Sequence, residues 1–280
     1  IDITGQASIC TDDCYDLLLD NFIGQAPFVL EYQVVAQSNG AVLETQSVAG
    51  LQNGDFITIC PSEAAVVEVL SLSDANTPSC ESLTSTSFII DFIPLPTATL
   101  SAPDGSNAVS ICEGEVLELN LTLTGTGPWE VAHDFAGQAS PLIVNASPFT
   151  WDLGAISSSF DVNLPSVFDQ SSACTNALNE VVSVTMNPLP TAGISSDQTI
   201  CAGVAASIIF NLDPAGAAPY DVEWTDGTNI TVSNGISDGF EVNPVFSADG
   251  QVCLLSISDN ANPTCSSTLN ECVDITVNDL

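Results

Sequence analysis

Cysteine is the residue type in this 280-residue chain whose chemistry is easiest to assign. The chain has ten cysteines and one histidine, without zinc-finger spacing, so its cysteines favour disulfide bonds over a metal site. Disulfides persist in oxidising compartments, and the sequence therefore predicts an extracellular or cell-surface protein. The ten are Cys10, Cys14, Cys60, Cys80, Cys112, Cys174, Cys201, Cys253, Cys265 and Cys272.

Charged side chains of this protein are almost exclusively carboxylates. Asp and Glu number 35, Lys and Arg are absent, and the formal net charge is −35 at pH 7. Recognition of nucleic-acid phosphates depends on Lys and Arg, so nucleic acid is excluded as a partner. A Schiff-base lysine, a P-loop lysine and an arginine finger are excluded for the same reason. No apolar run has the length of a membrane span, and we expect no membrane insertion.

Acidic turns offer the hard oxygen ligands that Ca²⁺ prefers, which makes calcium the one cofactor that the sequence suggests. The predicted ligands are Asp213, Asp221 and Asp226. Further acidic positions considered are Asp12, Asp13, Asp16 and Asp104. The chain has no EF-hand loop, and the alternative is a solvated acidic face with diffuse counterions.

Two patterns are typical of hydrolases. Residues 235–239 read Gly-Ile-Ser-Asp-Gly and match the G-x-S-x-G nucleophile motif, which requires a strand-to-helix turn, and no helix is predicted there. The single histidine, His133, aligns with Tyr32 and Trp224 in the repeats described below, which predicts a strand residue. Paired carboxylates, which glycosidases use, occur by chance in so acidic a chain. We predict that the protein is not an enzyme.

The chain consists of three repeats whose starts lie about 90 to 100 residues apart. Each opens on Ser-Ile-Cys or Thr-Ile-Cys, ending at Cys10, Cys112 and Cys201, and a closing cysteine follows later in each repeat. A Gly-x-x-Pro-aromatic motif occupies 24–28, 125–129 and 216–220. The linkers 94–98 and 188–192 both read Pro-Leu-Pro-Thr-Ala. A period of this length indicates one domain per repeat rather than a solenoid.

Within each repeat the hydrophobic pattern is that of β-strands. Leucines alternate with polar residues over 117–123, which is typical of a half-buried strand, and nothing sustains a helical period. About seven short strands in about 90 residues are typical of an immunoglobulin-like sandwich. We therefore predict an all-β protein of three tandem immunoglobulin-like β-sandwich domains, at 1–96, 97–190 and 191–280.

The repeat register predicts one disulfide within each domain, between its opening and its closing cysteine. These pairs are Cys10–Cys80, Cys112–Cys174 and Cys201–Cys265. The four other cysteines are predicted to pair as Cys253–Cys272, across the last hairpin, and Cys14–Cys60. Five disulfides and no free thiol are therefore expected.

The Ser-Ile-Cys, Gly-x-x-Pro-aromatic and Pro-Leu-Pro-Thr-Ala motifs together resemble the Ig-like or PKD-like tandem repeats of very large surface proteins of the Bacteroidota. The resemblance covers all three repeats. It implies export by the type IX secretion system and a role in gliding-associated surface adhesins and filaments.

Function is therefore predicted to be structural, in an extracellular filament or a cell-surface adhesin. The expected partners are further copies of the chain in a fibre, or neighbouring repeats of a longer chain. The alternative is a carbohydrate-binding adhesion module, which needs an exposed aromatic residue, and Trp151 is the candidate because it has no counterpart in the other repeats.

Overall fold

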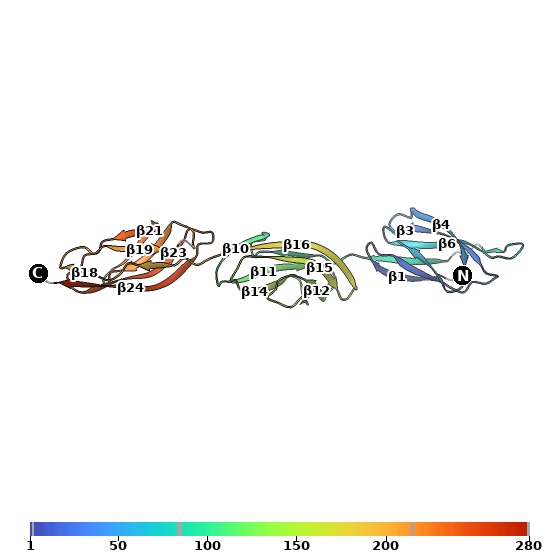
Figure 1. The fold of residues 1–280 in the computed structure, drawn as a ribbon. Helices are drawn as coiled ribbons and strands as arrows, with labels where there is room; N and C mark the ends of the chain where they lie inside the picture. The colour runs from blue at the N-terminus through green and yellow to red at the C-terminus, as the bar shows by residue number, and fades with distance from the viewer. Residues whose placement is uncertain (2, 83–85, 214–215, 279–280) are drawn as a thin grey trace.

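The computed structural model describes residues 1, 3–82, 86–213 and 216–278. This part of the chain is all-β and forms three immunoglobulin-like sandwiches in a row (Figure 1), which confirms the predicted fold class. The sandwiches are called units 1, 2 and 3 below. No described segment is a helix long and apolar enough to cross a membrane.

Unit 1 pairs a large sheet, in the order β1-β8-β6-β3-β4 with β7 added to β6, with a small sheet of β2 and β5. Its strands are β1 (Gly5–Cys10), β2 (Tyr15–Leu19), β3 (Phe28–Ala36), β4 (Val42–Leu51), β5 (Asp55–Ile59), β6 (Ala65–Ser73), β7 (Glu81–Ser82) and β8 (Ser87–Ile93).

Unit 2 has the same plan, with a large sheet in the order β10-β16-β15-β12-β13 and a small sheet in the order β14-β11-β9. Its strands are β9 (Ala98–Ser101), β10 (Ala108–Cys112), β11 (Val116–Leu123), β12 (Trp129–Ala132), β13 (Leu142–Val144), β14 (Phe149–Ala155), β15 (Phe160–Asp169) and β16 (Cys174–Asn187).

Unit 3 repeats the plan again, with sheets in the orders β18-β24-β23-β20-β21 and β17-β19-β22. Its strands are β17 (Ala192–Ile194), β18 (Gln198–Cys201), β19 (Ile208–Leu212), β20 (Tyr220–Thr225), β21 (Ile230–Ile236), β22 (Phe240–Val242), β23 (Gly250–Ser258) and β24 (Ser266–Asn278).

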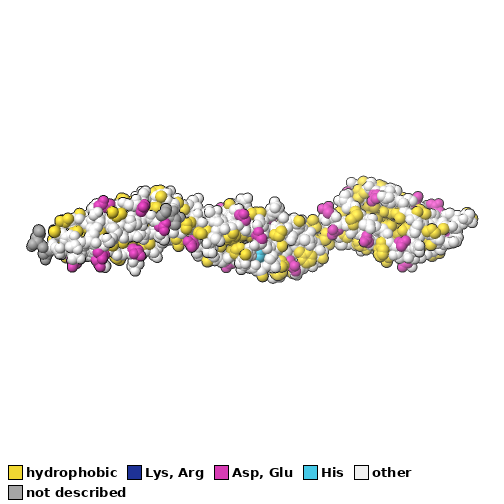
Figure 2. Space-filling view, in the orientation of Figure 1, with side chains coloured by type: hydrophobic (Ala, Val, Ile, Leu, Met, Phe, Trp, Pro, Cys, Tyr) yellow, Lys and Arg dark blue, Asp and Glu magenta, His cyan; other side chains and the backbone are white. Residues whose placement is uncertain are grey.

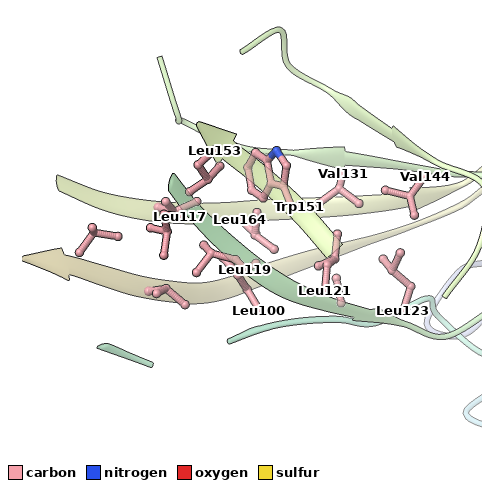
Figure 3. Packing of buried hydrophobic residues seen from close by; sticks show 14 of the residues in the cluster. Leu100, Leu117, Leu119, Leu121, Leu123, Val131, Val144, Trp151, Leu153 and Leu164 are labelled. Atoms are coloured by element: carbon pink, nitrogen blue, oxygen red, sulfur yellow. The ribbon is translucent and has the colours of Figure 1, made fainter. Parts of the chain in front are cut away.

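A separate hydrophobic core lies between the two sheets of each unit. In unit 2 the leucines of β11 point inward as the alternation predicted, and they pack beside Trp151 and Val131 (Figure 3). The aromatic residue of the Gly-x-x-Pro motif is the first residue of β3, β12 or β20 and is buried in each core. The three motif aromatics, Phe28, Trp129 and Tyr220, thus fix the same corner of the three sandwiches.

One pairing in each large sheet determines where the cysteines lie. The strand that ends at the opening cysteine runs parallel to the last strand of its unit, so β1 pairs with β8, β10 with β16 and β18 with β24. In this register Cys10 lies opposite Ile93, and Cys112 lies opposite Asn187. Each opening cysteine therefore lies at the end of its unit where the last strand finishes.

Candidate functional site

Two disulfides cross the junctions between units. Cys10 of unit 1 is bonded to Cys174 of unit 2, with a Cα–Cα distance of 5.7 Å. Cys112 of unit 2 is bonded to Cys265 of unit 3, with a Cα–Cα distance of 5.6 Å. In both cases the opening cysteine of one unit meets the closing cysteine of the unit that follows it.

These bonds correct the predicted pairs Cys10–Cys80, Cys112–Cys174 and Cys201–Cys265, none of which forms. The physical reason is the distance between the two cysteines along the unit, which unit 2 shows most directly. Cys174 begins β16, whereas Cys112 lies opposite Asn187 at its other end. Thirteen residues of extended strand place the two cysteines about 40 Å apart, whereas a disulfide needs Cα atoms within about 7 Å of one another.

The other two predicted disulfides are confirmed, and both lie inside single units. Cys14–Cys60 joins the residue before β2 to the residue after β5, with Cα atoms 4.2 Å apart. Cys253 and Cys272 lie opposite each other on β23 and β24, with Cα atoms 4.0 Å apart.

The expectation of five disulfides is wrong, because Cys80 and Cys201 are free and exposed. Cys80 is the closing cysteine of unit 1, and Cys201 is the opening cysteine of unit 3. Their counterparts in the junctions are less accessible, since Cys174 and Cys265 are each 0% exposed, Cys112 is 4% exposed and Cys10 is half-buried.

A single carboxylate in each unit joins the turn beside the closing cysteine to the Gly-x-x-Pro loop. In unit 3, one oxygen of Asp259 accepts the N–H of Cys265 at 2.9 Å and the other accepts the N–H of Ala217 at 3.2 Å. Asp74 does the same in unit 1, with the N–H of Cys80 at 2.9 Å and that of Gln25 at 3.4 Å. Each closing cysteine loop is therefore held against the motif loop.

Asp169 has this role in unit 2, where the cysteine turn is one residue shorter. Its carboxylate accepts the N–H of Thr126 at 2.8 Å and that of Ser171 at 2.9 Å. Burial alone would raise the pKa of Asp169, but these backbone hydrogen bonds and one from Ser172 outweigh it and hold the pKa below its ordinary value. The N–H of Cys80 is likewise the main cause of a lowered pKa at Asp74.

The motif glycine makes room for this carboxylate. A Cβ added to Gly125 would lie 2.5 Å from Oδ2 of Asp169, and a Cβ on Gly24 would lie 2.8 Å from Oδ2 of Asp74. Both glycines have positive φ angles, +108° and +135°, which side chains disfavour. The Gly-x-x-Pro motif, whose role the sequence left open, therefore shapes the loop that packs against the cysteine turn.

Sequence reasoning missed Asp74, Asp169 and Asp259 as a set. A signal was available, because the three repeats read Ser-Leu-Ser-Asp at 71–74, Ser-Val-Phe-Asp at 166–169 and Ser-Ile-Ser-Asp at 256–259. The aspartate ends this pattern at the end of a strand or just after it, ahead of the closing cysteine.

The predicted calcium ligands are not brought together. Asp221 lies on β20 and accepts the N–H of Gly235, whereas Asp226 lies in the turn after β20 and accepts the N–H groups of Thr228 and Asn229. Asp213 follows β19 and accepts a hydrogen bond from Thr191. The described residues contain no group of three or more acidic, histidine or cysteine side chains placed to hold a metal ion.

The G-x-S-x-G motif and His133 are not brought together into a catalytic site. Ser237 lies in the turn between β21 and β22, so the motif is followed by a strand and not by the helix that a nucleophile elbow needs. His133 belongs to another unit. It is 6% exposed, and its Nε2 lies 3.1 Å from the carbonyl oxygen of Ala139.

Trp151 cannot provide the predicted carbohydrate platform, because it is 2% exposed in the core of unit 2 (Figure 3). Its indole N–H donates to Oε1 of Gln138 at 2.7 Å, and the centroids of its ring and of the His133 ring are 4.8 Å apart. Trp129 and Trp224 are also buried. The carbohydrate-binding alternative therefore loses its candidate residue.

Comparison with known proteins gives likeness of fold only. No family model and no curated protein matches the chain. Among solved structures, Sidekick-1 immunoglobulin domains 1–5 are 14% identical, with a TM-score of 0.33, over 100% of this chain and 58% of that chain. This chain thus spans less than two thirds of that structure's length.

Two further solved structures are similar at equally low sequence identity and TM-score. The ICAM-5 D1–D4 ectodomain fragment is 13% identical, with a TM-score of 0.36, over 95% of this chain and 73% of that one. Fibronectin(III)-like modules of Clostridium thermocellum CbhA are 12% identical, with a TM-score of 0.28, over 67% and 91%. The assignment of immunoglobulin-like units therefore depends on the strand topology described above.

The disulfide arrangement can be tested by peptide mapping under non-reducing conditions with pepsin, since trypsin has no Lys or Arg to cut at. We expect Cys10 linked to Cys174 and Cys112 linked to Cys265, and thiol titration of the monomer should find the thiols of Cys80 and Cys201. A link between Cys112 and Cys174 would contradict the junction bonds.

Replacing the carboxylate in Asp169→Asn should lower the free energy of unfolding at pH 7 by about 2 kcal/mol, because an amide cannot accept both sets of backbone N–H groups. The folded pKa is lowered, so the contribution is present above the unfolded pKa of about 4 and is lost as pH falls through the folded value. Urea unfolding at pH 7 and pH 3 should show the difference shrinking in acid. Exposed Asp161→Asn, on the same strand, is the control and should change little.

Adding one methyl group in Gly125→Ala should destabilise unit 2 by more than the matched change Gly154→Ala. Both glycines have positive φ, +108° and +76°, but nothing lies within 4 Å of a Cβ at Gly154. The control therefore measures backbone strain of about 1 to 2 kcal/mol, and the excess measures the clash with Asp169 and, to a smaller degree, with Trp129. Equal losses in chemical unfolding would mean that the carboxylate moves aside freely.

Proposed function

We propose that the chain is a structural rod segment of an extracellular filament or cell-surface adhesin, in which disulfides carry load from one unit to the next. The observation that carries this proposal is the pair of bonds across the junctions, Cys10–Cys174 and Cys112–Cys265. Disulfides in this number favour an oxidising, extracellular compartment. The surface role agrees with the resemblance to secreted tandem repeats of the Bacteroidota.

Polar contacts at the first junction support a restrained connection. The side-chain amide of Asn176 in unit 2 donates to the carbonyl of Pro96 in the linker at 2.9 Å. Proline-rich linkers are semi-rigid, and the linker lies beside the Cys10–Cys174 bond. Neighbouring units are therefore connected by two covalent links, the backbone and the disulfide.

The absence of Lys and Arg makes covalent connection useful. With 35 acidic side chains, neighbouring units repel each other, and no Lys or Arg is available to offset the repulsion with a salt bridge. On the face shown in Figure 2, acidic side chains are spread along all three units rather than gathered in one patch. A disulfide holds a junction closed at any ionic strength.

Single-molecule stretching between the chain ends tests the proposal. When every unit is unfolded, disulfides leave only about 85 residues in the shortest covalent path, or about 30 nm at 3.5 Å per residue. Replacing all four junction cysteines, Cys10, Cys174, Cys112 and Cys265, by serine should lengthen the path to about 215 residues, or about 75 nm. Cys80 and Cys201 are alkylated throughout.

The matched control replaces the cysteines of the two bonds inside units, Cys14–Cys60 and Cys253–Cys272, by serine. Its path through both junction bonds is about 90 residues, so it should still extend to about 30 nm. Equal extension of the junction variant and the control would contradict a load-bearing junction. Electron microscopy of native material should show extended filaments or rods rather than isolated beads.

A further inference from the structure

The two free cysteines lie where a further junction would need them. In every unit, the residue that lies opposite the opening cysteine in the sheet comes thirteen positions after the closing cysteine. Ile93 lies opposite Cys10 and is thirteen residues after Cys80, and Asn278 lies opposite Cys201 and is thirteen residues after Cys265. Cys80 therefore lies at the end of unit 1 that faces away from unit 2, and Cys201 at the end of unit 3 that faces away from unit 2. In Figure 1 the blue-green segment around residue 80 and strand β18 lie toward opposite ends of the row.

Cys80 has the same backbone setting as Cys265, which is bonded across a junction. The N–H of each cysteine donates to an aspartate oxygen at 2.9 Å. Its carbonyl accepts the N–H of that same aspartate, at 3.1 Å for Asp74 and 3.0 Å for Asp259. The turn that presents Cys265 to unit 2 is therefore already formed around Cys80.

Cys201 likewise has the setting of the two opening cysteines that are bonded across junctions. The residue after each donates its N–H to the carbonyl of the last strand: Thr11 to Ile93 at 3.0 Å, Glu113 to Asn187 at 2.9 Å and Ala202 to Asn278 at 3.2 Å. Cys10 and Cys112 in this setting bond to the following unit, whereas Cys201 is exposed.

The surface beside Cys80 also corresponds to a junction surface. A hollow there is lined by Ile23, Phe28 and Asp74, among others, and Ile23 is 91% exposed. The equivalent hollow of unit 2, which Thr124 and Asp169 line, is bordered by Ile93 of unit 1 and by residues 94–95 of the linker. On unit 1 the matching surface, with its exposed isoleucine, is uncovered in the described chain.

We propose that Cys201 of one copy of this chain forms a disulfide with Cys80 of a second copy, so that copies join end to end by the same bond that joins the units within a copy. The proposal deepens the proposed structural function and rests on it. The partner is a second copy because its unit 1 carries the complementary cysteine, turn and uncovered surface.

The reaction needs an oxidant, which we take to be a small disulfide such as oxidised glutathione. The thiolate of one protein cysteine attacks the small disulfide, forming a mixed disulfide and releasing one small thiol. The thiolate of the other protein cysteine attacks the protein sulfur of that bond and releases the second small thiol. Two protein thiols are oxidised to one disulfide, and one small disulfide is reduced to two thiols.

Two single variants of the whole chain, Cys80→Ser and Cys201→Ser, test the pairing. In a glutathione redox buffer the wild type should give a ladder of multimers on a non-reducing gel, and either variant alone should remain monomeric. An equimolar mixture of the variants should give dimer and nothing larger, with a peptic peptide that links Cys80 to Cys201. Circular dichroism of each variant checks that its fold is kept.

Ionic strength supplies a second readout, because both partners are strongly acidic. The rate of dimer formation in the mixture should rise several-fold between 10 mM and 500 mM NaCl as repulsion is screened. Dimers formed equally well by one variant alone would overturn the proposal, since they would show unselective oxidation of exposed thiols. A wild type and a mixture that both remain monomeric would overturn it as well.

These results are independent of the stretching experiment, in which both thiols are alkylated. A chain that passes the stretching test but forms no Cys80–Cys201 bond would keep its role as a covalently connected rod and lose only the proposed end-to-end bond. A chain whose junction bonds carry no load would lose the structural role itself.

Discussion

The arrangement of this protein depends on one constraint: the opening and the closing cysteine of a unit lie at opposite ends of that unit. Thirteen extended residues separate Cys174 from the position opposite Cys112, about 40 Å in a strand. No side-chain movement closes such a gap, so the bond inside a unit is geometrically impossible. The same separation brings Cys10 and Cys112 to the unit that follows, where a closing cysteine lies within bonding distance.

Polar groups near the closing cysteine keep this geometry reproducible from unit to unit. The carboxylates of Asp74, Asp169 and Asp259 each accept N–H groups from two loops, the cysteine turn and the Gly-x-x-Pro loop. In a chain without Lys or Arg, backbone N–H groups and neutral side chains such as Thr126 are the donors that remain for a buried carboxylate. Hydrogen bonds to the main chain thus perform the role that ion pairs have in more balanced proteins.

The covalent junctions compensate for the uniform negative charge of the units. Repulsion between acidic units keeps separate molecules apart, and it would also loosen a row of units that only non-covalent contacts held together. Disulfides are insensitive to salt and connect only cysteines that geometry brings together. An extracellular row of such units can therefore remain connected where ionic strength varies, at the cost of sensitivity to reductants.

The sequence by itself determined what is local or periodic. Alternating leucines in 117–123 predicted a strand with one buried face, the repeats predicted three similar sandwiches, and hairpin spacing was sufficient to pair Cys253 with Cys272. Local pattern also indicated that the G-x-S-x-G segment lacks its helix. Which cysteine of which unit meets Cys10 was decided only by the tertiary structure, as were the burial of Trp151 and the separation of Asp213, Asp221 and Asp226. Alignment of the repeats shows which cysteines are equivalent from unit to unit, but it does not show at which end of a sandwich each cysteine lies. That position follows from the parallel pairing of strands that are far apart in the chain.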